Sequence, residues 1–165
     1  MKHVATNQQA CACERRGGRV ALDWPERSPR GEGLSTLRQD HRMLSSKRDQ
    51  TRTERQLSSC LTEACEVGKA QIVGFSWLTH EVDYGRFPES LQVTWIFTTE
   101  AQKTDALAQG QDALMRTLTR AALNEAGIDM EKLIAPVRFD SEEACKRADG
   151  GDWQRRLARS ATTRH

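Results

Sequence analysis

The sequence has no apolar run near the roughly 20 residues that a membrane-spanning helix requires. It also lacks the pattern of a secretory signal, because Arg15, Arg16 and Arg19 are not followed by an apolar stretch. These two absences argue against a membrane anchor and against export. We therefore expect a cytoplasmic protein with no membrane partner.

Cysteine is sparse and irregularly spaced, so the sequence offers neither a disulfide framework nor a metal motif. The five cysteines form no Cys-x-x-Cys pair and are Cys11, Cys13, Cys60, Cys65 and Cys145. An odd, scattered set is unlike a small secreted scaffold, and structural zinc usually takes two close pairs of ligands. The sequence predicts a reducing compartment and no metal or other cofactor.

Positive charge is unevenly distributed along the chain. Residues 1–49 carry 10 Lys and Arg against 6 Asp and Glu, whereas residues 50–158 carry 13 against 17. A nucleic-acid-binding domain usually has an excess of cations, because neutralised phosphates supply most of its affinity. The acidic balance of residues 50–158 is therefore an argument against DNA binding by that part.

The first 49 residues lack the periodic apolar positions of a helix or strand. Glycine and proline interrupt them at Gly17, Gly18, Pro25, Pro29, Gly31 and Gly33. We expect a disordered basic extension at 1–49, a folded domain at 50–158 and a disordered tail at 159–165. Met43 is a second possible start, and the patterned sequence follows it, so residues 1–42 are hypothesised to be an upstream extension.

The folded domain begins with a helix and two strands. Apolar residues recurring at three and four positions predict a helix over about 53–68, opened by a capping box of Thr51 and Glu54. Alternating apolar residues predict strands over 72–80 and 91–99, paired antiparallel across a long loop. In the first of these strands the side chains of Val73, Phe75 and Trp77 are expected on one face.

The second half of the domain continues with a helix, a strand and a helix. Thr99 and Gln102 form a second expected capping box, Gly110 is a possible kink, and Gly127 marks the helix end. A third strand is expected over 134–139, where Pro136 restricts it to a sheet edge or a strand start. A short helix capped by Asp140 and Glu143 follows.

These elements predict an α+β fold, a three-stranded sheet in the order α-β-β-α-β-α with the helices packed mainly on one face. The order resembles that of the type II KH fold. The GXXG loop with which KH domains clamp nucleic acid is missing from the sequence. The resemblance is therefore one of topology alone, and a shared topology hosts unrelated activities.

Nucleophilic chemistry has one set of candidates. His80 is the only histidine in residues 50–158, and Cys60, Cys65 or Cys145 could pair with it as thiol and imidazole. A lone histidine at a strand end is more often a hydrogen-bonding residue. We favour that second interpretation.

Acid/base or cation chemistry also has one candidate cluster, formed by Asp140, Glu142 and Glu143. Carboxylates at the start of a helix more commonly cap it and interact with its dipole. The capping role is the one that we expect.

The loop between the first two strands is the best candidate for a partner-binding site. It contains Asp83, Tyr84, Arg86 and Phe87, and aromatic residues with arginine are common at interaction surfaces. The alternative is that the two aromatic side chains pack beneath the sheet. The two interpretations are evenly balanced on the sequence.

Two resemblances bear on function. The runs GFSWLTHEVDYGRFPESLQV and VRFDSEEAC, followed by GGDW, resemble short proteobacterial proteins that are often labelled Fis-family transcriptional regulators. The run TRAAL with Gly127 and Ile128 is similar to the helix-turn-helix of Fis. That resemblance implies phosphate contacts by Arg116, Arg120 and Lys132.

The sequence thus leaves three functional hypotheses, in order of preference. The first is a non-enzymatic protein that binds another macromolecule, above all a protein, through its sheet or the loop at 83–88. The second is a Fis-type regulator that binds DNA. The third is a cysteine-dependent enzyme in which Cys65 or Cys145 is unusually reactive.

Overall fold

The computed structural model describes residues 3–5, 46–129 and 137–162, and every structural statement below concerns these residues. Their elements are, in chain order, β1 (His3–Ala5), α1 (Lys47–Gln71), β2 (Phe75–Val82), the 3-10 turn η1 (Tyr84–Arg86), β3 (Gln92–Phe97), α2 (Glu100–Ala108), α3 (Gln111–Glu125), β4 (Val137–Ser141), α4 (Glu142–Asp149) and α5 (Trp153–Thr162). From α1 onward this confirms the predicted α+β order of helix, strand, strand, helix, strand, helix.

The strands form one mixed sheet in the order β1-β2-β3-β4. β2 and β3 pair antiparallel, as predicted, and β4 joins β3 in parallel and lies at the edge of the sheet. At the other edge, β1 pairs antiparallel with β2, with Val4 opposite Glu81. This fourth strand was not expected, because its residues belong to the segment 1–49, for which the sequence predicts a disordered extension. Residues 6–45 and Pro136 lie outside the described residues.

The main core lies between one face of the sheet and the helices α1, α2 and α3. Val93, Trp95 and Phe97 alternate along β3, as predicted, and are fully buried. The Trp95 Nε1 group donates a hydrogen bond to Thr119 Oγ1 on α3 at 3.0 Å. A Cβ atom at Gly68 would lie 2.6 Å from the Trp95 ring, so glycine lets α1 approach the sheet closely.

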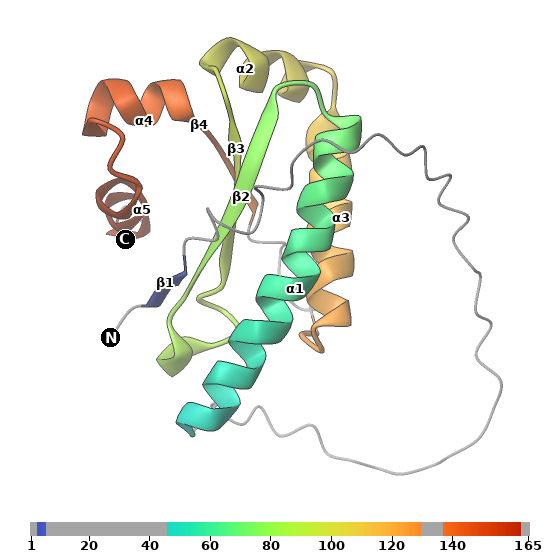
Figure 1. Ribbon diagram of the computed structural model, residues 1–165, viewed down its shortest axis with the longest axis vertical. Coiled ribbons are helices and arrows are strands. Elements are labelled where there is room, and N and C mark those ends of the chain that lie inside the picture. Colours follow the sequence, from blue (N-terminus) through green and yellow to red (C-terminus); the bar gives the residue numbers. More distant parts are fainter. Residues whose placement is uncertain (1–2, 6–45, 130–136, 163–165) are drawn as a thin grey trace, which may run out of the picture.

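The opposite face of the sheet is covered by α4 and α5 (Figure 1). A second apolar cluster forms there from Trp77, Ile96, Cys145, Trp153 and Leu157. The helices α1, α2 and α3, which include the two longest, lie on one face, as expected, and the other face is covered as well. The short helices at the C-terminal end carry enough apolar side chains to cover the second face.

A register shift between Phe75 and Trp77 explains why these two side chains do not share a face. Phe75 packs in the main core, whereas Trp77 packs against Trp153 at a ring-centroid distance of 5.1 Å. Val73 precedes the strand and is 83% exposed. The expected shared face is thus wrong, because a β-bulge reverses the alternation of side chains.

The helix ends show which sequence signals were effective. α1 starts earlier than predicted, because Ser46 caps it by accepting a hydrogen bond from the Asp49 N–H. The capping box of Thr99 and Gln102 is present as predicted. Gly110, at a φ of 74°, separates α2 from α3 and so ends a helix instead of kinking it.

The end of α3 matches the prediction, whereas the start of α4 differs from it by one residue. After α3, Gly127 has a φ of 78° and the Ile128 N–H bonds the Leu123 carbonyl, as the sequence predicts. Ser141, instead of Asp140, caps α4 by accepting a hydrogen bond from the Ala144 N–H. None of the helices in the described parts of the chain is long and apolar enough to span a membrane.

Candidate functional site

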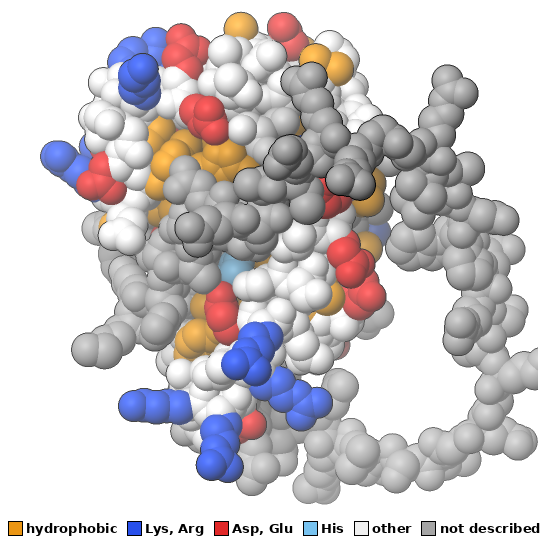
Figure 2. Space-filling view, viewed as in Figure 1, with side chains coloured by type: hydrophobic (Ala, Val, Ile, Leu, Met, Phe, Trp, Pro, Cys, Tyr) orange, Lys and Arg blue, Asp and Glu red, His pale blue; other side chains and the backbone are white. Residues whose placement is uncertain are grey.

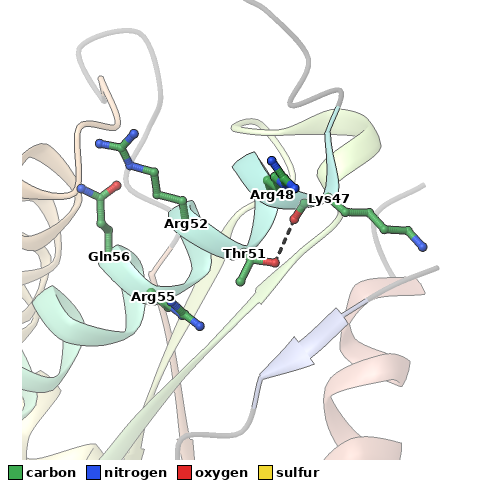
Figure 3. Close-up of a pocket in the computed structure, with 6 residues that line it drawn as sticks. All are labelled: Lys47, Arg48, Thr51, Arg52, Arg55 and Gln56. Atoms are coloured by element: carbon green, nitrogen blue, oxygen red, sulfur yellow. Dashed lines mark hydrogen bonds between the residues drawn. The ribbon is translucent and has the colours of Figure 1, made fainter.

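The first three turns of α1 carry a cluster of cations on the side of the helix that faces away from the core. We define the basic start of α1 as Lys47, Arg48, Arg52 and Arg55, all of which are exposed. With Thr51 and Gln56 they line an open hollow on the surface (Figure 3). Figure 2 shows Lys and Arg side chains gathered at the lower end of the molecule, over the start of α1.

The spacing of these cations follows from the helix geometry. Arg48, Arg52 and Arg55 are separated by four and three residues, so they lie on one stripe of the helix. Leu57 and Leu61, which are 0% and 1% exposed, lie on the opposite stripe and pack into the core. The helix is thereby anchored along one side and presents arginine along the other.

This arrangement is unfavourable for the isolated helix. Like charges three and four residues apart repel each other, and the helix dipole disfavours cations near the N-terminus. Asp49 is the one acidic residue in the first turn. No member of the basic start of α1 forms an ion pair with another residue of the described chain. The described residues therefore do not neutralise these four charges.

The nearby Glu54 is directed to the sheet side of α1. Its Oε1 lies 2.9 Å from His80 Nε2 on β2, and its Oε2 accepts a hydrogen bond of 2.6 Å from the Tyr84 hydroxyl. His80 is 2% exposed. Burial and the hydrogen bond to Glu54 raise the pKa of Tyr84 above its usual range. The carboxylate thus ties the start of α1 to the loop after β2.

That loop holds the four residues predicted to bind a partner, and the structure gives them different roles. Tyr84 is buried, and its ring centroid lies 6.0 Å from that of the half-buried Phe87. Asp83 Oδ1 accepts a hydrogen bond from the Gly85 N–H. The Arg86 side chain is 75% exposed, with Nε 3.5 Å from Asp83 Oδ2. The aromatic rings pack inward, and Arg86 is the one of the four that extends into solvent.

Arg116 and Arg120, two of the residues implied by the Fis resemblance, lie four residues apart on α3 and so on one side of that helix. Arg116 lies on α3, 3.6 Å from Asp112 and with its guanidinium 5.6 Å from the centre of the Phe139 ring. Arg120 is exposed on the same helix. Lys132, the third candidate, lies outside the described residues. α3 ends at Glu125, and residues 127–129 are not helical.

Of the three candidate thiols, Cys145 is separated from His80 by the sheet, whereas Cys60 and Cys65 lie on α1. Cys145 is 0% exposed on the α4 and α5 side of the sheet, whereas His80 meets Glu54 on the α1 side. Burial raises the pKa of the Cys145 thiol and also that of the half-buried Cys60. A raised pKa lowers the thiolate fraction at neutral pH, which is the opposite of what a nucleophile needs.

The acidic cluster at the start of α4 forms structural contacts. Glu142 Oε1 accepts hydrogen bonds of 2.9 Å from Ser76 Oγ and Trp77 Nε1. Glu143 Oε2 accepts one from the Glu100 N–H. Asp140 binds the Arg156 guanidinium through both carboxylate oxygens, at 2.6 and 2.7 Å.

Within the described ranges, no group of three or more His, Cys, Asp and Glu residues could hold a metal ion.

The basic start of α1 is not apparent from the charge of long segments. Residues 47–49 fall in the expected disordered extension and the other cations in the expected folded domain, so the cluster is divided between two regions. The detectable signal was the spacing of Arg48, Arg52 and Arg55, which form one helical stripe when the helix is extended to Ser46.

The fold and this surface define an α+β domain with a helical, cationic candidate binding face. In comparisons with known proteins, no family model, no curated protein and no solved structure matches the chain.

Proposed function

We propose that this domain is a non-enzymatic module that binds a polyanionic macromolecule through the basic start of α1. The observation that carries the proposal is the cluster of four exposed cations without ion pairs to the described residues, two of which, Lys47 and Arg48, lie in the first turn, where the helix dipole disfavours them. Each repulsive pair costs a helix about 0.2–0.5 kcal/mol. An anionic ligand would neutralise these charges, and the relief of their repulsion would add to the free energy of binding.

The rigidity of the surface supports the proposal. Leu57 and Leu61 anchor α1 in the core, and Glu54 links it to β2 and to the loop at 83–88. Binding groups on an anchored helix lose little conformational freedom when a ligand arrives. The same surroundings place the exposed Arg86 on the loop beside α1, where it adds a further cation.

The setting of the proposed activity is the cytoplasm. Cys60 and Cys145 are free thiols. Free thiols accord with a reducing compartment, where nucleic acids and acidic proteins are both abundant polyanions.

Heparin, a generic polyanion, provides the test. The α1 triple variant combines Arg48→Gln, Arg52→Gln and Arg55→Gln, which retain helix propensity and remove three charges. We expect wild type to bind immobilised heparin at low salt and the α1 triple variant to elute at clearly lower salt. Equal elution of the two proteins would contradict the proposal.

A charge-matched control separates a local site from a general effect of net charge. Lys146, Arg147 and Arg155 are exposed cations on α4 and α5, across the sheet from α1. The α4/α5 control variant replaces all three with Gln. Its elution from heparin should stay close to that of wild type, because its changes leave the basic start of α1 intact.

A further inference from the structure

We infer that the polyanion is a nucleic-acid duplex, held by its phosphates without reading of the bases. This inference rests on the proposed function and adds the class of partner to it. Three features of the described residues support it: the chemistry of the hollow on α1, the position of the aromatic side chains, and the length of the arginine stripe.

The hollow on α1 has the side chains that bind phosphate. Its six lining residues are Lys47, Arg48, Thr51, Arg52, Arg55 and Gln56, all charged or polar (Figure 3). Arginine, lysine, threonine and glutamine are regular donors to phosphate oxygens in protein complexes with nucleic acids. Arginine is especially suited, because its planar guanidinium donates two parallel hydrogen bonds.

The same surface lacks what a protein partner normally requires. Stable protein interfaces are centred on buried anchors, chiefly Trp, Tyr and Arg, and combine arginine with aromatic or apolar side chains. Among the described residues, Val73 is the one large apolar side chain that is exposed, and it lies at the opposite end of α1. An acidic protein could thus find charge at the basic start of α1 but no apolar anchor beside it.

The aromatic side chains also favour a duplex over a single strand. Single strands are bound by stacking their bases on exposed aromatic rings. None of the aromatic rings in the described chain is exposed: Phe75, Trp77, Tyr84, Trp95, Phe97 and Trp153 are buried, and Phe87 and Phe139 are half-buried. A duplex keeps its bases stacked internally and needs no such platform, so its phosphates match a surface that offers charge alone.

The length of the arginine stripe fits several phosphates at once. Seven residues separate Arg48 from Arg55, which corresponds to about 10 Å along a helix. Along one strand a duplex presents one phosphate per roughly 3.4 Å of its axis, so about three lie within that length. The other side of α1 is packed on the sheet and α3, so the exposed stripe is the side that is available to the backbone.

Fluorescence anisotropy with the full chain tests the inference. The probes are two labelled 20-base-pair DNA duplexes of unrelated sequence, an RNA duplex, one DNA single strand and a poly-glutamate peptide. We expect both DNA duplexes to bind with affinities within about twofold of each other, and both more tightly than the single strand or the peptide. The RNA duplex reports whether the site distinguishes the two kinds of backbone.

Salt dependence identifies the contacts. With four phosphates neutralised, the logarithm of the association constant should fall against the logarithm of salt concentration with a slope of about −3.6. The α1 triple variant should reduce the size of that slope by about 2.7, whereas the α4/α5 control variant should leave it unchanged. Circular dichroism shows whether each variant is folded.

The outcomes separate the inference from the function on which it rests. If poly-glutamate binds through the three arginines and the duplexes do not, the proposed function stands and the inference of a duplex is overturned. If neither the duplexes, the peptide nor heparin binds, both fall. If duplex binding is the same in wild type and the α1 triple variant, the assigned surface is wrong.

Discussion

Two groups of arginines in this protein differ in their surroundings. On α5, Arg156 and Arg159 reach the carboxylates of Asp140 and Asp149, with contacts between 2.6 and 3.0 Å. At the basic start of α1, four cations have no ion pair with the described residues. The comparison separates cations that hold the fold together from cations that are available to a ligand.

The α5 group is built like a structural ion network. Arg156 and Asp140 side chains are each 17% exposed, and the Asp149 side chain is fully buried. The hydrogen bond to Asp140 raises the pKa of the Arg156 guanidinium, so its charge is held by the fold. This network fastens α5 to β4 and to the end of α4, and thereby covers the second face of the sheet.

The largest expected effect comes from breaking the structural group. Arg156→Met should lower the free energy of unfolding by about 3 kcal/mol, because it leaves Asp140 without its cation and removes one of the two cations that contact the buried Asp149. Urea unfolding followed by tryptophan fluorescence measures the loss. Heparin binding should be unchanged. A stability within 1 kcal/mol of wild type would show that the network contributes little.

A smaller effect is expected where α1 meets the loop. Glu54→Ala should lower the free energy of unfolding by about 2 kcal/mol, since hydrogen bonds to a charged group contribute roughly 1.5–3 kcal/mol. Tyr84→Phe should cost about 1 kcal/mol by removing only one of the two contacts. If Tyr84→Phe costs as much as Glu54→Ala, the contact between Glu54 and His80 adds nothing. Urea unfolding again gives the values.

Substitutions at the basic start of α1 are expected to stabilise the fold instead of destabilising it. The α1 triple variant should raise the free energy of unfolding by roughly 0.5–1 kcal/mol, because it removes repulsive pairs and an unfavourable interaction with the helix dipole. The thermal midpoint, measured without any polyanion, provides the check. A destabilised variant would mean that these arginines have structural partners after all, and the contrast with α5 would disappear.

The smallest expected effect is a change in the pH dependence of stability, caused by Glu100 at the start of α2. Hydrogen bonds from Lys103 and then from Ser141 lower the pKa of Glu100 below its usual value. A carboxyl group whose pKa is lowered in the folded state stabilises the protein above its unfolded pKa. That contribution is lost as the pH falls through the folded pKa.

Comparison of wild type with Glu100→Gln isolates this contribution. Wild type should lose stability between neutral and mildly acidic pH by more than the variant does, because the variant has no carboxyl group to titrate. Thermal midpoints across that pH range supply the measurement. Parallel curves for the two proteins would show that Glu100 is not stabilised in the fold.

The order of elements could be predicted because each has a local signal. Val93, Trp95 and Phe97 alternate along β3. The capping box of Thr99 and Gln102 involves residues only three positions apart. Gly127 with Ile128 is a similarly local helix end. Such features depend on residues within one helical turn or a few strand positions, so they can be predicted without knowledge of the tertiary structure.

What could not be predicted depends on distant contacts. The bulge that separates Phe75 from Trp77 follows from pairing with β3 and cannot be recognised in β2 alone. The contact of Glu54 with His80 joins residues 26 positions apart. The start of α1 differs for another reason, since its exposed stripe is cationic and Thr51 with Glu54 mimics a capping box inside the helix, whereas Ser46 is the residue that caps it.

Of the candidate site and its surroundings, only the loop at 83–88 was predicted from the sequence. The loop at 83–88 was predicted to meet a partner, but its aromatic rings pack inward, as the alternative interpretation stated. Exposure of an aromatic side chain cannot be deduced from composition, because it depends on which apolar residues lie beneath. Whether Arg86 contacts a partner together with α1 stays a prediction.

One experiment bears most directly on the claim that the cations of α1 are held for a ligand. Affinity for a DNA duplex should be measured at 50 mM salt for wild type, the α1 triple variant and the α4/α5 control variant. The account predicts at least a tenfold weakening for the first variant and a change of less than twofold for the second. Equal weakening in both would mean that net charge, and no particular surface, attracts the polyanion.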